Sequence, residues 1–125
     1  MTQIFLTIGA IFAGLSVAAG AFGAHALREK ISERMLEIFD TGARYQMYHA
    51  LALLLIAILM IILKNSSNTL VISGWLFIIG IVIFSGSLYA LSLTNIKILG
   101  AITPIGGVAL IAGWIFLAIS ALTNK

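Results

Sequence analysis

The chain has no cysteine, a single proline and very little charge. Without cysteine it can form no disulfide, and it offers neither a thiolate ligand nor a cysteine nucleophile. Charged residues make up only 9% of its 125 positions, whereas hydrophobic residues make up 62%. In soluble domains about a quarter of the residues are charged. The composition therefore indicates an integral membrane protein.

The few charges are also unevenly placed. Eight of the eleven charged residues, including all four acidic ones, lie in the seventeen-residue segment 28–44. The other three are single lysines at the edges of long uncharged runs, which cover residues 1–27, 45–63, 65–96 and 98–124. A bilayer core about 30 Å thick needs roughly 20 apolar residues, and every run supplies about that many. The charge pattern thus predicts four membrane spans.

We predict one all-α domain over residues 1–125, a four-helix transmembrane bundle. Each span must be helical, because an unpaired backbone amide in the lipid core costs several kcal/mol. The second and third connections, 64–69 and 94–97, are short enough to make neighbouring helices antiparallel. The predicted spans cover about residues 4–26, 45–63, 70–93 and 98–122.

Segment 28–44, between the first two spans, has the pattern of an amphipathic helix, because apolar residues recur along it at helical spacing. Ser32 followed by Glu33 suits a helix start. Asp40 and Arg44 stand at positions i and i+4 in the favourable order. We interpret the segment as an interfacial helix or as an extension of the second span, with solvated charges opposite an apolar stripe. A surface for docking a partner is the alternative.

The distribution of lysine and arginine predicts the orientation. An even number of spans places both termini on one side, together with loop 64–69 and two basic residues. The opposite side has five basic residues, namely Arg28, Lys30, Arg34, Arg44 and Lys97. Cytoplasmic loops carry an excess of lysine and arginine. We therefore expect segment 28–44 to be a cytoplasmic amphipathic connector and both termini to lie outside.

Small residues recur at spacings that favour close helix packing, especially in the first and fourth spans. They let helix backbones approach closely where no hydrophobic effect drives association. Pro104, six residues into the fourth span, should kink this helix or loosen its first turn. The residues that we expect to act in packing or kinking are Gly20, Gly23, Gly86, Pro104, Gly106, Gly107 and Gly113.

Polar and aromatic side chains gather toward one face of the membrane. Counted from the nearest charge at 1.5 Å per residue, both histidines, Tyr89 and Thr103 lie about 5–9 Å inside that face. Lipid offers no hydrogen-bond partner, so we expect both histidines and Tyr89 to face the bundle interior. We further expect the histidines to share a partner or ligand, with Arg44 at the mouth. The candidate ligand-binding residues are His25, Arg28, Arg44, Tyr45, Gln46, Tyr48, His49, Ser85, Ser87, Tyr89 and Thr103.

Other interpretations of these residues stay open. The histidines could form an interhelical hydrogen bond, and the tyrosines could belong to an interfacial aromatic belt. Metal or haem ligation would need a further ligand type that nothing nearby supplies, so we predict neither metal nor cofactor. The sequence has no H-E-x-x-H, G-x-S-x-G or P-loop motif and no paired carboxylates within a span, so we predict no enzyme.

Four motifs resemble a known family. They are GAFGAHALR (20–28), YQMYHALALL (45–54), FSGSLYAL (84–91), and TPIGG (103–107) followed by AGW (112–114). In order and over essentially the whole chain they are similar to the small four-span bacterial proteins called domain-of-unknown-function 423, whose animal relatives are named transmembrane protein 256. The resemblance implies an integral protein of the bacterial plasma membrane and implies no activity. Its signature falls on Gly23, His25, Tyr45, Gln46, His49, Ser85, Gly86, Ser87, Tyr89, Pro104, Gly106 and Gly107.

These observations favour a non-enzymatic membrane protein, either an accessory subunit or a protein that binds a lipid or small molecule. The alternative is a minimal transporter or channel, expected to be oligomeric because one bundle of this size encloses little space. An enzyme that uses His25 and His49 is the weakest hypothesis. The expected partners are membrane lipids and either further copies of the chain or a larger membrane complex. The net charge of +3 is too small and too clustered for a nucleic-acid partner.

The predicted orientation can be checked with reporter fusions at Lys125 and within loop 64–69. Both fusions should report the exterior, because the opposite side carries five of the seven basic residues. A cytoplasmic signal from the fusion at Lys125 would show the orientation to be reversed.

Overall fold

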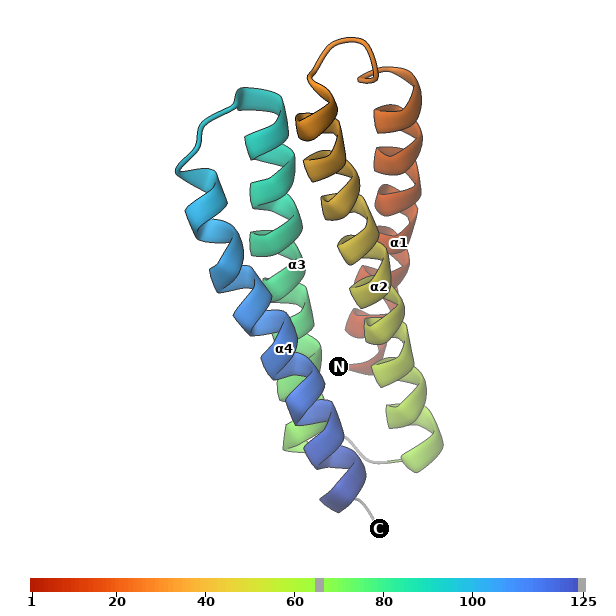
Figure 1. Ribbon diagram of the computed structural model, residues 1–125. Coiled ribbons are helices and arrows are strands. Elements are labelled where there is room, and N and C mark those ends of the chain that lie inside the picture. Colours follow the sequence, from red (N-terminus) through yellow and green to blue (C-terminus); the bar gives the residue numbers. More distant parts are fainter. Residues whose placement is uncertain (65–66, 124–125) are drawn as a thin grey trace.

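The computed structural model describes residues 1–64 and 67–123. Lys125, one of the basic residues counted for the predicted orientation, lies outside the described residues. The described residues form four α-helices, namely α1 (Thr2–His25), α2 (Glu33–Leu63), α3 (Asn68–Thr94) and α4 (Leu99–Thr123) (Figure 1). Each is long and apolar enough to cross a membrane. The prediction of an all-α bundle with four transmembrane helices is thus confirmed.

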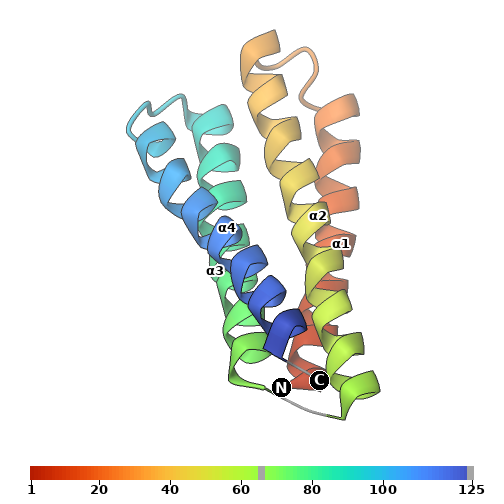
Figure 2. The same cartoon turned by 60° about the horizontal axis from the view of Figure 1, so that its bottom comes forward.

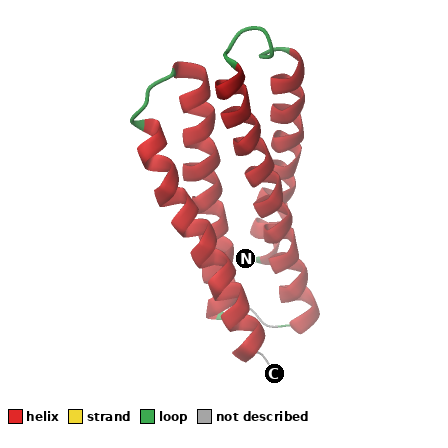
Figure 3. Ribbon diagram, viewed as in Figure 1, coloured by secondary structure: helices red, strands yellow, loops and turns green. Residues whose placement is uncertain are grey.

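The bundle consists of two antiparallel hairpins. Helix α1 packs against α2 and α3 against α4, and the hairpins join through α2 and α3 (Figures 1 and 2). Helices α1 and α4 therefore lie on the outside of the arrangement. Only short connections separate the helices (Figure 3).

Helix α2 includes most of the segment predicted to connect the first two spans. It begins directly after Ser32, whose side-chain oxygen accepts a hydrogen bond from the backbone N–H of Met35 at 3.2 Å. From Glu33 it runs unbroken to Leu63. Its 31 residues measure about 46 Å, well beyond a bilayer core. From Glu33 onward, segment 28–44 is therefore an extension of the second span and not a separate interfacial helix.

Two contacts fix the overlap of α1 with α2. The hydroxyl of Ser16 donates a hydrogen bond to the carbonyl of Ala43 at 2.6 Å. Gly23 lies so close to Phe39 that an added Cβ would be 3.0 Å from its ring. The first turns of α2 therefore lie alongside α1 and not beyond its end. As a result, the charged turns of α2 lie next to an uncharged part of α1.

Apolar side chains fill the centre of the bundle. Helices α1, α2 and α3 contribute fully or almost fully buried residues, which include Phe5, Leu53, Ile56, Leu70 and Phe77. Leu110 brings α4 into the same cluster. This core holds the hairpins together in the half of the bundle farther from the charged segment.

Two glycines allow α4 to lie directly on α3. A Cβ at Gly106 would overlap the backbone of Phe84, and a Cβ at Gly113 would lie 2.6 Å from the ring of Phe77. Gly107 makes only ordinary contact, since its added Cβ would be 3.7 Å from the ring of Phe84. The helix continues through Pro104 without interruption.

The predicted packing role is wrong for Gly20 and Gly86. An added Cβ at either position would meet nothing within 4 Å, so neither glycine makes a close contact with another helix. Sequence spacing did not reveal this, because the rotation of a helix decides which of its small residues meets a neighbour. The same sequence reasoning missed four tightly packed positions, which are Gly9, Gly42, Gly74 and Gly80.

Replacing Gly106 with leucine should destabilise the protein, because the side chain would push α4 away from the backbone of α3. Overpacking of this kind costs about 1–3 kcal/mol or more. Thermal unfolding in detergent measures the effect, with Gly86→Leu at the open surface of α3 as the matched control. Equal melting temperatures for the two variants would remove the packing role of Gly106.

Candidate functional site

Gln46 connects three helices. Its side-chain N–H donates to the carbonyl of Phe12 on α1 at 2.8 Å, and its side-chain oxygen accepts from the hydroxyl of Tyr89 on α3 at 2.6 Å. The ring of Tyr89 also packs against Phe39, with 4.9 Å between ring centroids. Gln46 is buried, so these bonds replace those that water would make. They fix α2 in position and rotation against both neighbours.

Three further candidate residues also make their hydrogen bonds inside the bundle. Ser85 donates to the carbonyl of Gly42 at 2.7 Å and so ties α3 to α2. The hydroxyls of Ser87 and Thr103 lie 2.6 Å apart and tie α3 to α4. These contacts connect helices, and they account for the polarity of the residues without a ligand.

His49 has a partner at each ring nitrogen. Nδ1 lies 2.8 Å from the carbonyl of Tyr45, and Nε2 lies 3.0 Å from the indole nitrogen of Trp114. A neutral ring with its proton on Nδ1 satisfies both contacts, because Nδ1 then donates and Nε2 accepts from the indole N–H. No lone pair is then left for a metal. The sequence reasoning missed Trp114, although an indole N–H within a span needs such a partner.

His25 does not share a site with His49. It lies exposed in the last turn of α1. Two residues earlier, Gly23 contacts Phe39, which precedes His49 by ten residues, or about 15 Å along the helix. The prediction that the histidines share a ligand, and that His25 faces the interior, is therefore wrong. The depth counts for the two histidines were not comparable, because Arg28 follows the end of α1 whereas Arg44 lies about three turns inside α2.

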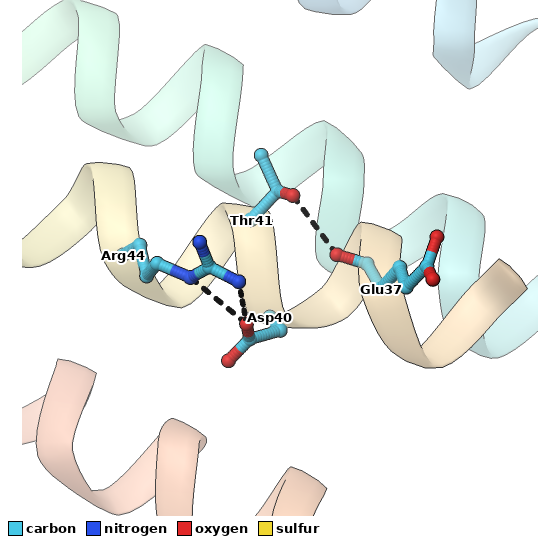
Figure 4. A network of polar contacts seen from close by, with 4 residues as sticks. All are labelled: Glu37, Asp40, Thr41 and Arg44. Atoms are coloured by element: carbon cyan, nitrogen blue, oxygen red, sulfur yellow. Dashed lines mark hydrogen bonds and ion pairs between the residues drawn. The ribbon is translucent and has the colours of Figure 1, made fainter. Parts of the chain in front are cut away.

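Arg44 lies in a hollow with Ser16 and Gly20 of α1, whereas His49 contacts Trp114 of α4, so the prediction that Arg44 closes a mouth above the histidines is wrong. Its guanidinium group pairs with Asp40, and Nε donates to Oδ2 of this carboxylate at 2.9 Å. Figure 4 shows the pair between α2 and α1. Arg28 is exposed in the connection between α1 and α2.

The remaining candidates Tyr45 and Tyr48 belong to a groove of about 630 Å³ on the side of the bundle. We call it the aromatic groove; its lining residues are Tyr45, Tyr48, His49, Phe84, Gly107, Leu110, Ile111 and Trp114. The rings of Tyr45 and Phe84 are 4.9 Å apart, and those of His49 and Trp114 are 5.8 Å apart. Gly107 leaves part of the α4 wall without a side chain. The groove is therefore mostly aromatic, with one neutral histidine at its base.

The aromatic groove is open at its side. Tyr45, Tyr48 and Trp114 are 40%, 52% and 43% exposed. Among residues 1–64 and 67–123 neither tyrosine hydroxyl has a hydrogen-bond partner. The groove thus offers aromatic surface and two phenolic hydroxyls to a molecule that approaches from the bilayer.

Residues 19–107 match a family model described as a protein of unknown function, DUF423. The chain belongs to the DUF423 family. Among its relatives, the UPF0382 membrane protein YwdK of Bacillus subtilis is 50% identical over 120 residues, which cover 96% of this chain and 97% of YwdK. A UPF0382 membrane protein of Staphylococcus epidermidis is 48% identical over 96% of both chains. No solved structure matches the chain. The family resemblance is thus confirmed, and this DUF423 chain is a multi-pass membrane protein.

The polar groups around the aromatic groove of this DUF423 protein are few. The described residues contain no group of three histidine or acidic side chains that could hold a metal ion. The lining of the aromatic groove has no carboxylate, and both nitrogens of His49 are engaged.

Tyr89→Phe should lower the stability of this DUF423 protein, because it leaves the buried side-chain oxygen of Gln46 without its donor. An unsatisfied buried acceptor costs about 1–3 kcal/mol. Thermal unfolding in detergent measures the loss. Tyr48→Phe is the matched control, since it removes an exposed hydroxyl without a partner among the described residues. If both variants melt at the temperature of the original protein, Gln46 does not depend on Tyr89.

Proposed function

We propose that this DUF423 protein binds a lipid or another small amphiphile in the aromatic groove, as a non-enzymatic protein of the bacterial plasma membrane. The observation that carries the proposal is the groove itself, which is about 630 Å³ in volume and opens sideways from the bundle. Ligand sites commonly enclose about 300–1,000 Å³ and combine aromatic walls with a few polar groups. The relatives are named as membrane proteins, which supports the location in a membrane.

The positions of the polar groups support a ligand with one polar end. Tyr45 directly follows Arg44, the last charged residue before an uncharged run of the chain. Tyrosines are enriched at this level, where a bilayer changes from headgroups to acyl chains. The two phenolic hydroxyls would bond the polar end of an amphiphile. Its apolar part would lie deeper, against Leu110 and Trp114.

The alternative function, a minimal transporter, finds less support. Phe5, Leu53 and Phe77 are fully buried in the central cluster, so a single copy has no open polar path there among its described residues. Transport would therefore need an oligomer or a large rearrangement. An accessory role in a larger membrane complex is compatible with lipid binding.

We also infer, from the basic residues alone, that segment 28–44 faces the cytoplasm.

Filling the aromatic groove tests the proposal. Gly107→Leu places a branched side chain in the groove wall, where the backbone has room for a Cβ. The matched control is Gly86→Leu, at open surface on α3. Both changes are made in a Trp75→Phe background, which leaves Trp114 as the single tryptophan. The readout is Trp114 fluorescence in detergent during titration with a brominated phospholipid, which quenches tryptophan on contact.

We expect saturable quenching for the background protein and for Gly86→Leu, and at least a tenfold weaker apparent affinity for Gly107→Leu. The physical reason is that the leucine occupies the volume that the acyl chain would fill. Identical quenching curves for Gly107→Leu and Gly86→Leu would contradict binding in this groove.

A further inference from the structure

A charged cluster lies beside uncharged parts of the other helices. Asp40 and Arg44 form an ion pair on α2, with side chains that are 48% and 62% exposed. The bond from Ser16 to Ala43 places this pair beside a point on α1 that precedes the first charge, Arg28, by twelve residues, or about 18 Å. The ion pair thus lies at the level of an uncharged stretch of α1.

The other hairpin is uncharged at the same level. Ser85 of α3 bonds the carbonyl of Gly42, which lies between the two charged residues of the pair. Ser87 then contacts Thr103, six residues or about 9 Å beyond Lys97. Around this level only α2 carries charge. Charged groups that face acyl chains are costly, so this pair needs polar surroundings from outside the protein.

The length of α2 places the cluster at the edge of the bilayer core. A core about 30 Å thick takes up roughly 20 residues, and a count back from Lys64 at the end of α2 reaches Arg44. Asp40 lies about 6 Å and Glu37 about 10 Å farther out along the helix. These three side chains therefore lie where lipid headgroups begin.

Two adjoining hollows beside the cluster are spaces that a lipid headgroup could occupy. The outer one, of about 240 Å³, is lined by Glu37 and Asp40 and by Gly20 and Gly23 on α1. The inner one, of about 200 Å³, contains Asp40, Arg44 and Gly20. A Cβ at Gly20 would meet nothing within 4 Å, so this glycine leaves space that no protein atom fills. The hollows meet at Gly20 and Asp40.

The charges follow the order of those in a zwitterionic phospholipid. From the headgroup layer inward the cluster presents Glu37 and Asp40, then Arg44, then the apolar side chain of Met47. Such a lipid presents its ammonium group, then its phosphate, then its acyl chains. We propose that these hollows bind phosphatidylethanolamine, with the ammonium group against the two carboxylates and the phosphate against Arg44. This site and the aromatic groove share only Tyr48 among their lining residues and rest on different interactions, so either can fail without the other.

The geometry of the ion pair leaves atoms for both contacts. Nε and Nη2 of Arg44 both donate to Oδ2 of Asp40. Oδ1 of Asp40 and the Nη1 donors of Arg44 are left for a ligand (Figure 4). A primary ammonium group has three N–H donors and matches carboxylates, which only accept hydrogen bonds. Phosphatidylcholine lacks these donors, and an anionic lipid would meet a net negative cluster.

The test is native mass spectrometry of the purified protein in detergent with equimolar phosphatidylethanolamine, phosphatidylcholine and phosphatidylglycerol. We expect the original protein to retain at least threefold more phosphatidylethanolamine than either competitor. The decisive variant is the exchange Asp40→Arg with Arg44→Asp, which keeps an opposite pair at i and i+4 but reverses the order of charge. It should lose the preference. Glu33→Gln, in the first turn of α2 and outside both hollows, should keep it.

A second variant keeps the test valid if the protein with both exchanged residues misfolds. Glu37→Gln changes one exposed side chain and should reduce the preference at least twofold. Equal retention of the three lipids by the original protein would overturn the proposal, and so would an undiminished preference in Glu37→Gln. Loss of the preference in Gly107→Leu, with no loss in the exchanged pair, would place the lipid in the aromatic groove instead.

Discussion

Lipid supplies no hydrogen-bond partners, so polar side chains within the bundle need partners in the protein, and several find them on a neighbouring helix. Three serines meet this constraint in the same way, since Ser16, Ser85 and Ser73 each donate to a backbone carbonyl of an adjacent helix. Two of the three acceptors belong to glycines, Gly42 and Gly113. A residue without a side chain lets the helices approach and also leaves its carbonyl accessible. Close packing and hydrogen bonding therefore fix the same register between neighbouring helices.

This register gives α2 two different sides. Because Ser16 binds the carbonyl of Ala43, the charged turns of α2 run along α1. Asp40 and Arg44 point into the space beside α1, whereas Tyr45 and His49 point toward α4. Successive residues in a helix are about 100° apart, so adjacent positions can serve opposite sides. One stretch of α2 thus borders both the charged hollows and the aromatic groove.

The sequence was sufficient to predict the helices but insufficient to predict their relative positions. Charged residues are costly in the lipid core, so the uncharged runs located all four spans, and Ser32 correctly marked a helix start. Depths counted from the nearest charge could not be compared between α1 and α2, because Arg28 lies beyond the end of α1 whereas Arg44 lies about three turns inside α2. The partner of His49, Trp114, is 65 residues away, and no local pattern indicates that they meet. Helix rotation, which sequence spacing does not determine, decides which glycines pack.

The distribution of satisfied and unsatisfied polar groups favours lipid binding over a pore. Gln46 and His49 lie deep in the bundle, and their hydrogen bonds go to other parts of the protein. Among the described residues that line the aromatic groove and the inner hollow, hydrogen-bonding capacity remains on the hydroxyls of Tyr45 and Tyr48 and on the ion pair between Asp40 and Arg44. All of these lie toward one face and open sideways. A pore would need polar groups along most of its path, apart from any hydrophobic constriction. Polar groups confined to the headgroup level instead suit a molecule whose polar end stays at the surface while its tail remains in the bilayer.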